Sequence, residues 1–237
     1  MRLIFAKKPA RKRRWVIAAA MVAGLAGLYW HIAHDSHDLS TQPAIQHNGP
    51  PWVYGPADAR FTVIEYADLE CPFCKAHFAV MHQWIDQTAA RSATHSAGPS
   101  VNWQWHHLPL SGHDPAASQS ALVAECAGHV HGNDAFWKTA EWLYQHTRGN
   151  GQGLPAETPV PEADSLRACL ADKAMAQRLE QQVAQAHQLG ITGTPTLVVK
   201  DNLTGKAMPI AGPASGDALL SAIDLLAGDA PGAQPAP

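Results

Sequence analysis

Apolar positions along the chain follow first a strand pattern and then a helix pattern. Residues 61–66 (FTVIEY) form a short run that is apolar on both faces, which is typical of a central strand. The next segment instead carries large apolar residues at helical spacing, namely Phe78, Met81, Trp84 and Ile85. The pattern therefore predicts a strand followed by a helix, with Cys71-Pro72-Phe73-Cys74 at the junction.

The rest of the chain predicts a small sheet interrupted by a block of helices. Further strands are expected at 52–54, 101–105, 196–200 and 207–210, and Pro209 places the last at a sheet edge. A loop rich in Ser, Gly and Ala is expected at 91–100, and a final helix at 215–226. Residues 114–189 are predicted to be almost entirely helical. This order indicates an α/β fold, a mixed sheet with helices on both sides and an all-helical insertion at about 114–189.

The first fifth of the chain adds a membrane or export signal to this picture. Seven of the 17 Lys and Arg residues lie within residues 1–14, and residues 15–33 contain no Lys, Arg, Asp or Glu. These nineteen residues approach the ~20 needed to cross a bilayer, and the basic cluster is expected to stay in the cytoplasm. We therefore predict a basic cytoplasmic segment (1–14), a membrane anchor or signal segment (15–33) and a linker (34–51). A cleaved signal peptide ending near residues 24–26 is the alternative.

The net charge of the remaining chain limits the classes of partner that it can bind. Beyond residue 14 it carries 10 Lys and Arg against all 20 Asp and Glu. An acidic body argues against nucleic acid as a partner. We expect a folded domain at 52–227 and a disordered, Pro/Gly/Ala-rich tail at 228–237. Export to the periplasm would place the four cysteines in an oxidising compartment, where disulfides persist.

The Cys-x-x-Cys sequence at the start of the helix suits thiol–disulfide chemistry. Cys71 would occupy the helix N-terminus, where unpaired N–H groups and the helix dipole favour a thiolate. Such a position lowers a cysteine pKa from about 8.5 to roughly 3.5–7.5. Pro72 fits the first helical turn, and Cys74, one turn further in, would act as the resolving thiol.

The same spacing also fits half of a zinc site. His77 would supply a third ligand, but no second Cys-x-x-Cys or spaced Cys/His pair follows. We therefore predict no metal and no organic cofactor. A tethered metal-binding or assembly module built on Cys71, Cys74 and histidines is the alternative to a redox site.

Three segments together resemble the DsbA-like branch of the thioredoxin superfamily, which comprises exported thiol:disulfide oxidoreductases. They are residues 65–74 (EYADLECPFC), 107–110 (HLPL) and 193–196 (GTPT). The resemblance extends over about 52–226, nearly the whole predicted domain. It implies a thioredoxin fold that contains a helical insertion.

The resemblance also assigns roles around the cysteines. It implies that Pro195 is cis and packs beside them, and that the Thr194 backbone binds an extended substrate strand. Pro72 and Phe73 are expected to contact substrate as well. Phe73 replaces the histidine of the strongly oxidising members, which argues against an extreme oxidising potential.

Two further expectations concern residues away from the motif itself. Glu65 resembles the family's buried acid, which exchanges a proton with the resolving thiol; a solvent-facing strand residue is the alternative. Cys126 and Cys169 are expected to form a structural disulfide, as in relatives; two buried free thiols are the alternative. His77 and His107 are expected to be structural or surface residues.

The resulting functional hypothesis is a monomeric, membrane-tethered enzyme that introduces disulfides into exported cysteine-containing proteins. By resemblance, a quinone-linked membrane partner would reoxidise it. A disulfide reductase or isomerase using the same residues is the main alternative.

Overall fold

The computed structural model describes residues 52–95 and 99–228. The segments predicted at 1–14, 15–33 and 34–51, and the predicted tail after residue 228, lie outside this range. No helix within it is both long and apolar enough to span a membrane. Its elements are β1 (Trp52–Tyr54), β2 (Phe61–Ala67), α2 (Pro72–His95), β3 (Val101–His107), η2 (Ser111–His113), α3 (Ala116–His131), α4 (Asn133–His146), α5 (Ala163–Leu170), α6 (Lys173–Gln188), β4 (Thr196–Asp201), β5 (Ala207–Ala211) and α7 (Gly216–Gly228).

The five strands form one mixed sheet in the order β1-β3-β2-β4-β5. Strand β2 is central, parallel to β3 and antiparallel to β4. The outer pairs, β1 with β3 and β4 with β5, are antiparallel. Pro209 lies in the edge strand β5, as predicted. The mixed sheet expected from the sequence is therefore confirmed.

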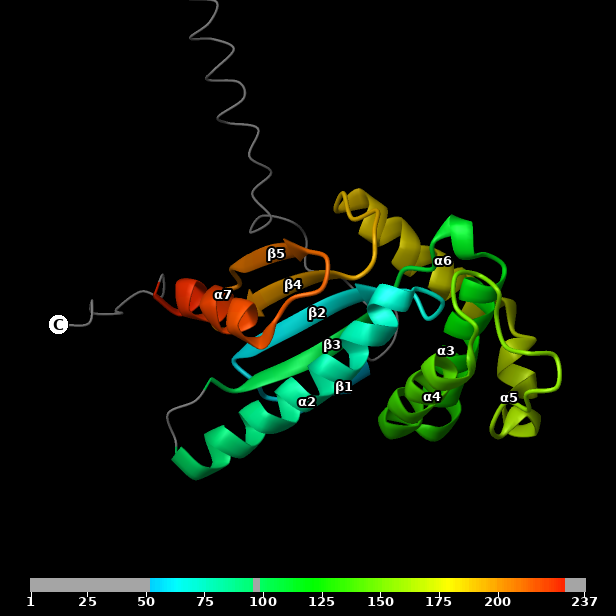
Figure 1. Cartoon of the computed structure of the whole chain (residues 1–237), viewed down its shortest axis with the longest axis horizontal. Helices are drawn as coiled ribbons and strands as arrows, with labels where there is room; N and C mark the ends of the chain where they lie inside the picture. Colours follow the sequence, from blue (N-terminus) through cyan, green and yellow to red (C-terminus); the bar gives the residue numbers. More distant parts are fainter. Residues whose placement is uncertain (1–51, 96–98, 229–237) are drawn as a thin grey trace, which may run out of the picture. The chain divides into compact units, whose positions relative to one another are not determined.

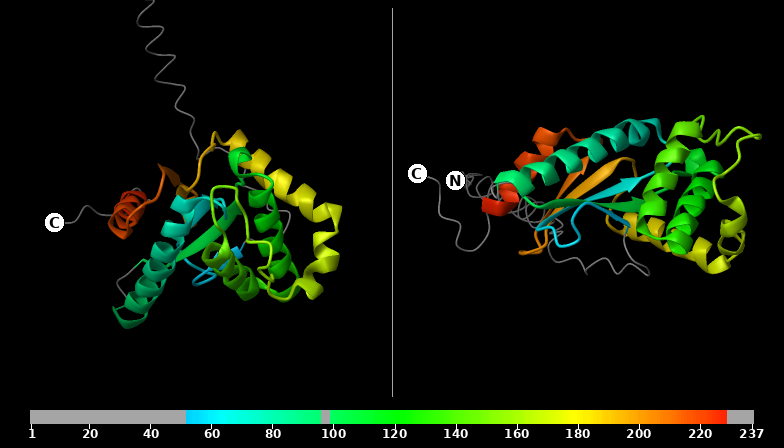
Figure 2. Two further views of the ribbon diagram at one scale, coloured as in Figure 1. Left: turned by 45° about the vertical axis from the view of Figure 1, so that its right-hand side comes forward. Right: turned by 90° about the horizontal axis from the view of Figure 1, so that it is seen from below.

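Alternation along β2 separates two hydrophobic cores. Phe61 and Val63 belong to the core shared with α2 and α7, while Ile64 and Tyr66 belong to a second core with the end of α6. Figure 2 shows α2 and α7 covering the same face of the sheet. Because side chains alternate along a strand, Glu65 points to the α2 face, where the cysteines lie.

The predicted helical insertion consists of α3 to α6, which gather beside one end of the sheet (Figure 1). A disulfide between Cys126 and Cys169 joins α3 to α5. Both cysteines are buried in a small core of their own with Leu166 and Met175. The alternative of two free thiols is therefore wrong for this structure.

A cluster of aromatic side chains connects the insertion to the sheet. Trp137 of α4 packs against Trp103 of β3 with ring centroids 4.5 Å apart, and Phe136 stacks on Trp52 of β1 at 5.0 Å. Each such pair contributes about 0.5–1.5 kcal/mol beyond its buried area. Helix α4 is thus held against the face of the sheet that also carries α2.

Two backbone features differ from, or add to, the sequence prediction. The loop expected at 91–100 begins later, because α2 continues to His95. Ala89, Ala90 and Arg91 are strong helix formers and extend the helix past its last large apolar residues. A cis peptide bond precedes Pro115 in addition to the one that precedes Pro195.

Candidate active site

The loop between β2 and α2 is held by the buried carboxylate of Asp68. Its Oδ1 accepts the N–H of Glu70 at 2.7 Å, and its Oδ2 accepts the N–H of Leu110 at 3.0 Å. Oδ2 also lies 2.7 Å from Nδ1 of His113. The backbone carbonyl of Asp68 accepts the N–H of Cys71 at 3.1 Å. Asp68 therefore fixes where helix α2 begins.

Glu70 ties the same loop to the segment that follows α4. Its carboxylate is fully buried and accepts hydrogen bonds from the Thr147 hydroxyl and from the N–H of Gly153. The Glu70 carbonyl accepts the N–H of Asn150 at 2.7 Å. The residue directly before Cys71 is thus anchored to the helical insertion.

The two active-site cysteines are free thiols with very different acidities. Both are buried, with relative exposures of 3% for Cys71 and 0% for Cys74. The hydrogen bond from the Cys74 thiol, aided by the backbone N–H groups of Cys74 and Phe73, lowers the pKa of Cys71 to about 5 against the opposing effect of burial. Burial, followed by the bond to Cys71, raises the pKa of Cys74 far above its usual value. Near neutral pH the pair holds one thiolate, on Cys71.

The peptide bond between Thr194 and Pro195 is cis and lies beside Cys71. Sγ of Cys71 lies 3.6 Å from the Thr194 carbonyl oxygen, to which it donates when the thiol is protonated. Pro72 and Phe73, which follow Cys71 in the chain, are exposed, Phe73 with 66% of its surface accessible. The reactive sulfur thus has the Thr194 backbone as a neighbour and is followed in sequence by two exposed residues.

Glu65 lies on the α2 face of the sheet and is fully buried, so the solvent-facing alternative is wrong. Its Oε1 is 3.1 Å from Nδ1 of His77, one helical turn after Cys74. Burial raises the pKa of Glu65, while His77 acts against this rise. Burial alone would lower the pKa of His77, but the Glu65 carboxylate raises it above its usual value.

The sequence analysis named His77 only as a third ligand of the alternative zinc site and otherwise expected it to be structural or on the surface. It is 2% exposed and contacts Glu65, so it is not a surface residue. The signal was present in its spacing, because His77 lies three residues after Cys74 and four before Met81, on the buried face of α2. His107 is also buried, between the Trp105 indole and Glu125.

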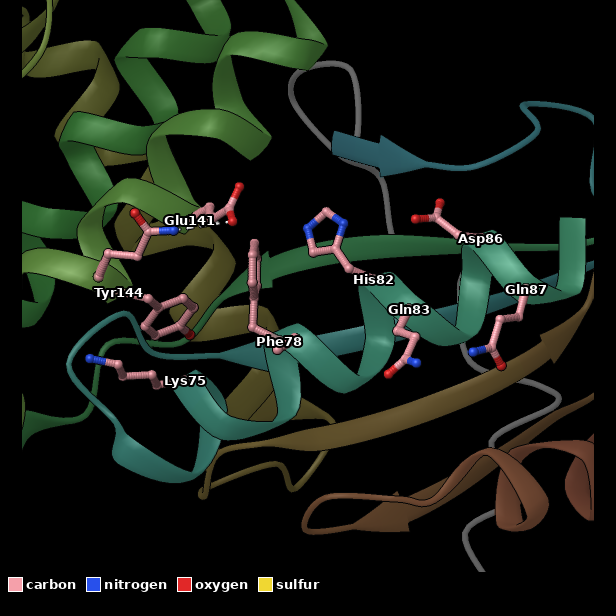
Figure 3. Close-up of a pocket in the computed structure, with 10 residues that line it drawn as sticks. Lys75, Phe78, His82, Gln83, Asp86, Gln87, Glu141 and Tyr144 are labelled. Carbon is pink, nitrogen blue, oxygen red and sulfur yellow. Dashed lines mark hydrogen bonds between the residues drawn. The ribbon is translucent and has the colours of Figure 1, made fainter. Parts of the chain in front are cut away.

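A cavity of about 620 Å³ lies between α2 and α4, and its lining includes Lys75, the residue after Cys74. Figure 3 shows Phe78 and His82 of α2 facing Glu141 and Tyr144 of α4 across it. Within the described residues, no group of three His, Cys, Asp or Glu side chains is arranged to hold a metal ion.

A dithiol pair at the start of a helix, on a mixed sheet with a helical insertion and a neighbouring cis-proline, defines the DsbA-like thiol:disulfide oxidoreductases. A family model described as thioredoxin matches residues 47–224, and the chain belongs to this family. The chain is 39% identical to DsbA2 of Pseudomonas aeruginosa, with a TM-score of 0.69 over 78% of this chain and 98% of that one. This protein is therefore a thiol:disulfide oxidoreductase of the DsbA type, with Cys71 and Cys74 as its CXXC pair.

The chain is also similar to a more distant solved structure and to part of two curated antiporters. BdbD from Bacillus subtilis, at 21% identity, shares the fold with a TM-score of 0.57 over 78% of this chain and 95% of that one. Among curated proteins, the Na(+)/H(+) antiporter NhaA 3 of Salinispora tropica is 36% identical over 151 residues, 62% of this chain. NhaA 1 of Salinispora arenicola is 34% identical over 154 residues. The matched part of the chain spans only 21% of either antiporter's length.

Proposed function

We propose that the protein is exported and introduces disulfides into cysteine-containing exported proteins. A substrate thiolate attacks Sγ of Cys71 in the Cys71–Cys74 disulfide, and Cys74 leaves. A second substrate thiolate then attacks the substrate sulfur of the mixed disulfide and releases Cys71, so the substrate leaves oxidised and the enzyme ends as a dithiol.

The low pKa of Cys71, about 5, is the observation that carries this proposal. A thiolate that is stabilised in the dithiol form makes reduction of the enzyme favourable, and the disulfide form is then an oxidant. The value lies between those of thioredoxin, about 7, and of the strongly oxidising DsbA, about 3.5. We therefore expect an oxidant of intermediate strength, in line with Phe73 in place of histidine.

The surrounding residues divide the work of binding and proton transfer. An extended substrate segment pairs with the Thr194 backbone, beside Pro195, while the exposed rings of Pro72 and Phe73 contact its side chains. Glu65 accepts or returns the proton of Cys74, whose raised pKa demands a partner for that proton.

Export and tethering are supported by two separate features. The Cys126–Cys169 disulfide is of a kind that persists in oxidising compartments. Residues 1–33 have the charge and hydropathy of a membrane anchor with a cytoplasmic basic end. A tethered enzyme would meet a quinone-linked membrane reoxidase in the same bilayer. We propose that the enzyme acts as a monomer.

The reduction potential of the Cys71–Cys74 pair tests the direction of the reaction. It is measured by equilibration with glutathione redox buffers followed by alkylation of free thiols. We expect a value between about −120 mV, typical of DsbA, and about −200 mV. A value near −270 mV, as in thioredoxin, would replace the oxidase proposal with that of a reductase.

A further inference from the structure

A buried histidine lies where the proton of the resolving cysteine must travel. His77 follows Cys74 by one helical turn and faces Glu65 from α2. Its Nε2 lies 3.1 Å from the carbonyl of Ala214, in the segment before α7. With 2% of its surface exposed, the imidazole is held at both ring nitrogens by fixed partners. A histidine held in this way favours the ionised form of its neighbour, Glu65.

We propose that His77 is a positioning residue for proton transfer: its Nδ1–H holds Glu65 as a carboxylate able to accept the proton of Cys74. This proposal rests on the role assigned above to Glu65 in thiol exchange. His77 does not touch the reacting sulfurs; it acts through Glu65 Oε1. The other oxygen, Oε2, is buried and makes no hydrogen bond of ordinary geometry within the described residues, so it can take a proton; the Trp103 indole is the other side-chain donor that acts on the Glu65 carboxylate.

Proton transfer to Glu65 accompanies the step in which Cys74 resolves a mixed disulfide. Cys74 Sγ loses its proton to Glu65, forms a bond with Cys71 Sγ, and the bond between Cys71 and the bound thiol breaks. The released thiolate takes the electron pair, and Glu65 holds the proton until exchange with solvent. In the opposite direction, Glu65 returns the proton to Cys74 as Cys74 leaves.

Few charged groups act on His77, so its effect on the Glu65 carboxylate can be measured apart from the effects of other residues. The carboxylate of Glu65, from β2, raises the pKa of His77. The segment before α7 contributes only a backbone contact, from Ala214. The charge of Cys71, at the start of α2, raises the pKa values of Glu65 and of Cys74. Tyr144 of α4, buried near the same groups, has a pKa raised by burial and so stays neutral.

The test isolates the resolving step. A mixed disulfide is formed between Cys71 and glutathione, and the release of glutathione by Cys74 is followed in a single turnover from pH 5 to 9. For the substitution His77→Asn, which keeps a neutral N–H near Nδ1 but cannot carry charge, we expect the inflection of the pH–rate profile to rise by about one unit. At any pH below both inflections, release should slow by about tenfold, the factor that corresponds to one pKa unit.

Two further variants distinguish this role from a structural one. The substitution Glu65→Gln should remove the inflection, and adding His77→Asn to it should cause no further slowing, because the two act in one path. His82→Asn, on the same helix but without a bond to Glu65, should leave the inflection in place.

An inflection that does not move in His77→Asn would overturn the proposal, even if the rate falls at every pH, because a structural defect has that effect. Additive slowing in the double variant would overturn it as well. The assay does not depend on the direction of net reaction, so a reductase potential would refute the oxidase proposal and leave this test intact.

Discussion

At the scale of single residues, the chemistry depends on an acidity difference between two thiols separated by one helical turn. The Cys74 thiol is the largest influence that lowers the pKa of Cys71. The substitution Cys74→Ala should therefore raise the pKa of Cys71 above about 5, since it removes the hydrogen bond. Cys74→Ser keeps a hydroxyl donor and should leave the pKa near that of the wild type. The pH dependence of iodoacetamide alkylation of Cys71 measures both; equal pKa values in the two variants would contradict the assignment.

The same shift makes the stability of the reduced protein depend on pH. A cysteine whose pKa is lowered in the folded state adds stability that is complete above its unfolded pKa of about 8.5 and disappears as the pH falls through about 5. Cys74, with a raised pKa, stays protonated in this window. The unfolding free energy of the reduced protein should thus rise with pH, by at most about 1.4 kcal/mol per unit, relative to Cys71→Ser. Urea unfolding between pH 5 and 8 measures this difference, and a constant difference would contradict the lowered pKa.

At the scale of elements, Glu70 joins the loop before α2 to the segment after α4. The substitution Glu70→Ala leaves the Thr147 hydroxyl and the Gly153 N–H without their carboxylate partner. We expect a loss of about 2–3 kcal/mol in unfolding free energy, because hydrogen bonds to a buried charge are strong. Glu141→Ala, an exposed position on α4, is the matched control and should change stability by less than about 0.5 kcal/mol. Similar losses in both variants would mean that the Glu70 contacts contribute little.

The disulfide between α3 and α5 belongs to the same scale. It closes a loop with a sequence separation of 43 residues, which corresponds to about 4 kcal/mol in the chain-entropy model. Replacing Cys126 and Cys169 together by Ala should lower the unfolding free energy by about this amount. Because these cysteines have a core of their own, the alkylation pKa of Cys71 should not change. A shift in that pKa would show that the disulfide also supports the active site.

The elements explain which parts of the structure could be predicted from sequence. The apolar run in β2, the spacing on α2 and the edge position of Pro209 are local patterns, and each matches the structure. The roles of Asp68 and Glu70 could not be predicted in this way. Their partners Leu110 and Gly153 lie 42 and 83 residues further along the chain, and only the fold brings them together.

At the scale of the whole molecule, the reacting groups and the contacts that anchor them come from different parts of the fold. Strand β2 and α2 supply Glu65, the cysteines and His77, while the cis-proline segment before β4 closes the site from a distant part of the chain. The insertion contributes anchoring contacts to the loop before Cys71 rather than reacting groups. Pro72 and Phe73 are exposed and Thr194 is partly exposed, and it is these residues that we propose to contact substrates.

The N-terminal segment determines whether the catalytic domain stays attached to the membrane. Residues 15–33, if helical, span about 29 Å, close to the ~30 Å of a bilayer's hydrocarbon core. The full chain produced in a Gram-negative host should stay in the membrane fraction after carbonate washing, with an intact N-terminus by mass spectrometry. A chain whose residues 1–33 are replaced by a cleavable signal peptide should be released with the periplasmic contents and keep the same alkylation pKa at Cys71. A shortened, soluble product from the full chain would instead indicate a cleaved signal peptide, and reoxidation by the proposed membrane partner would then depend on diffusion rather than on a tether.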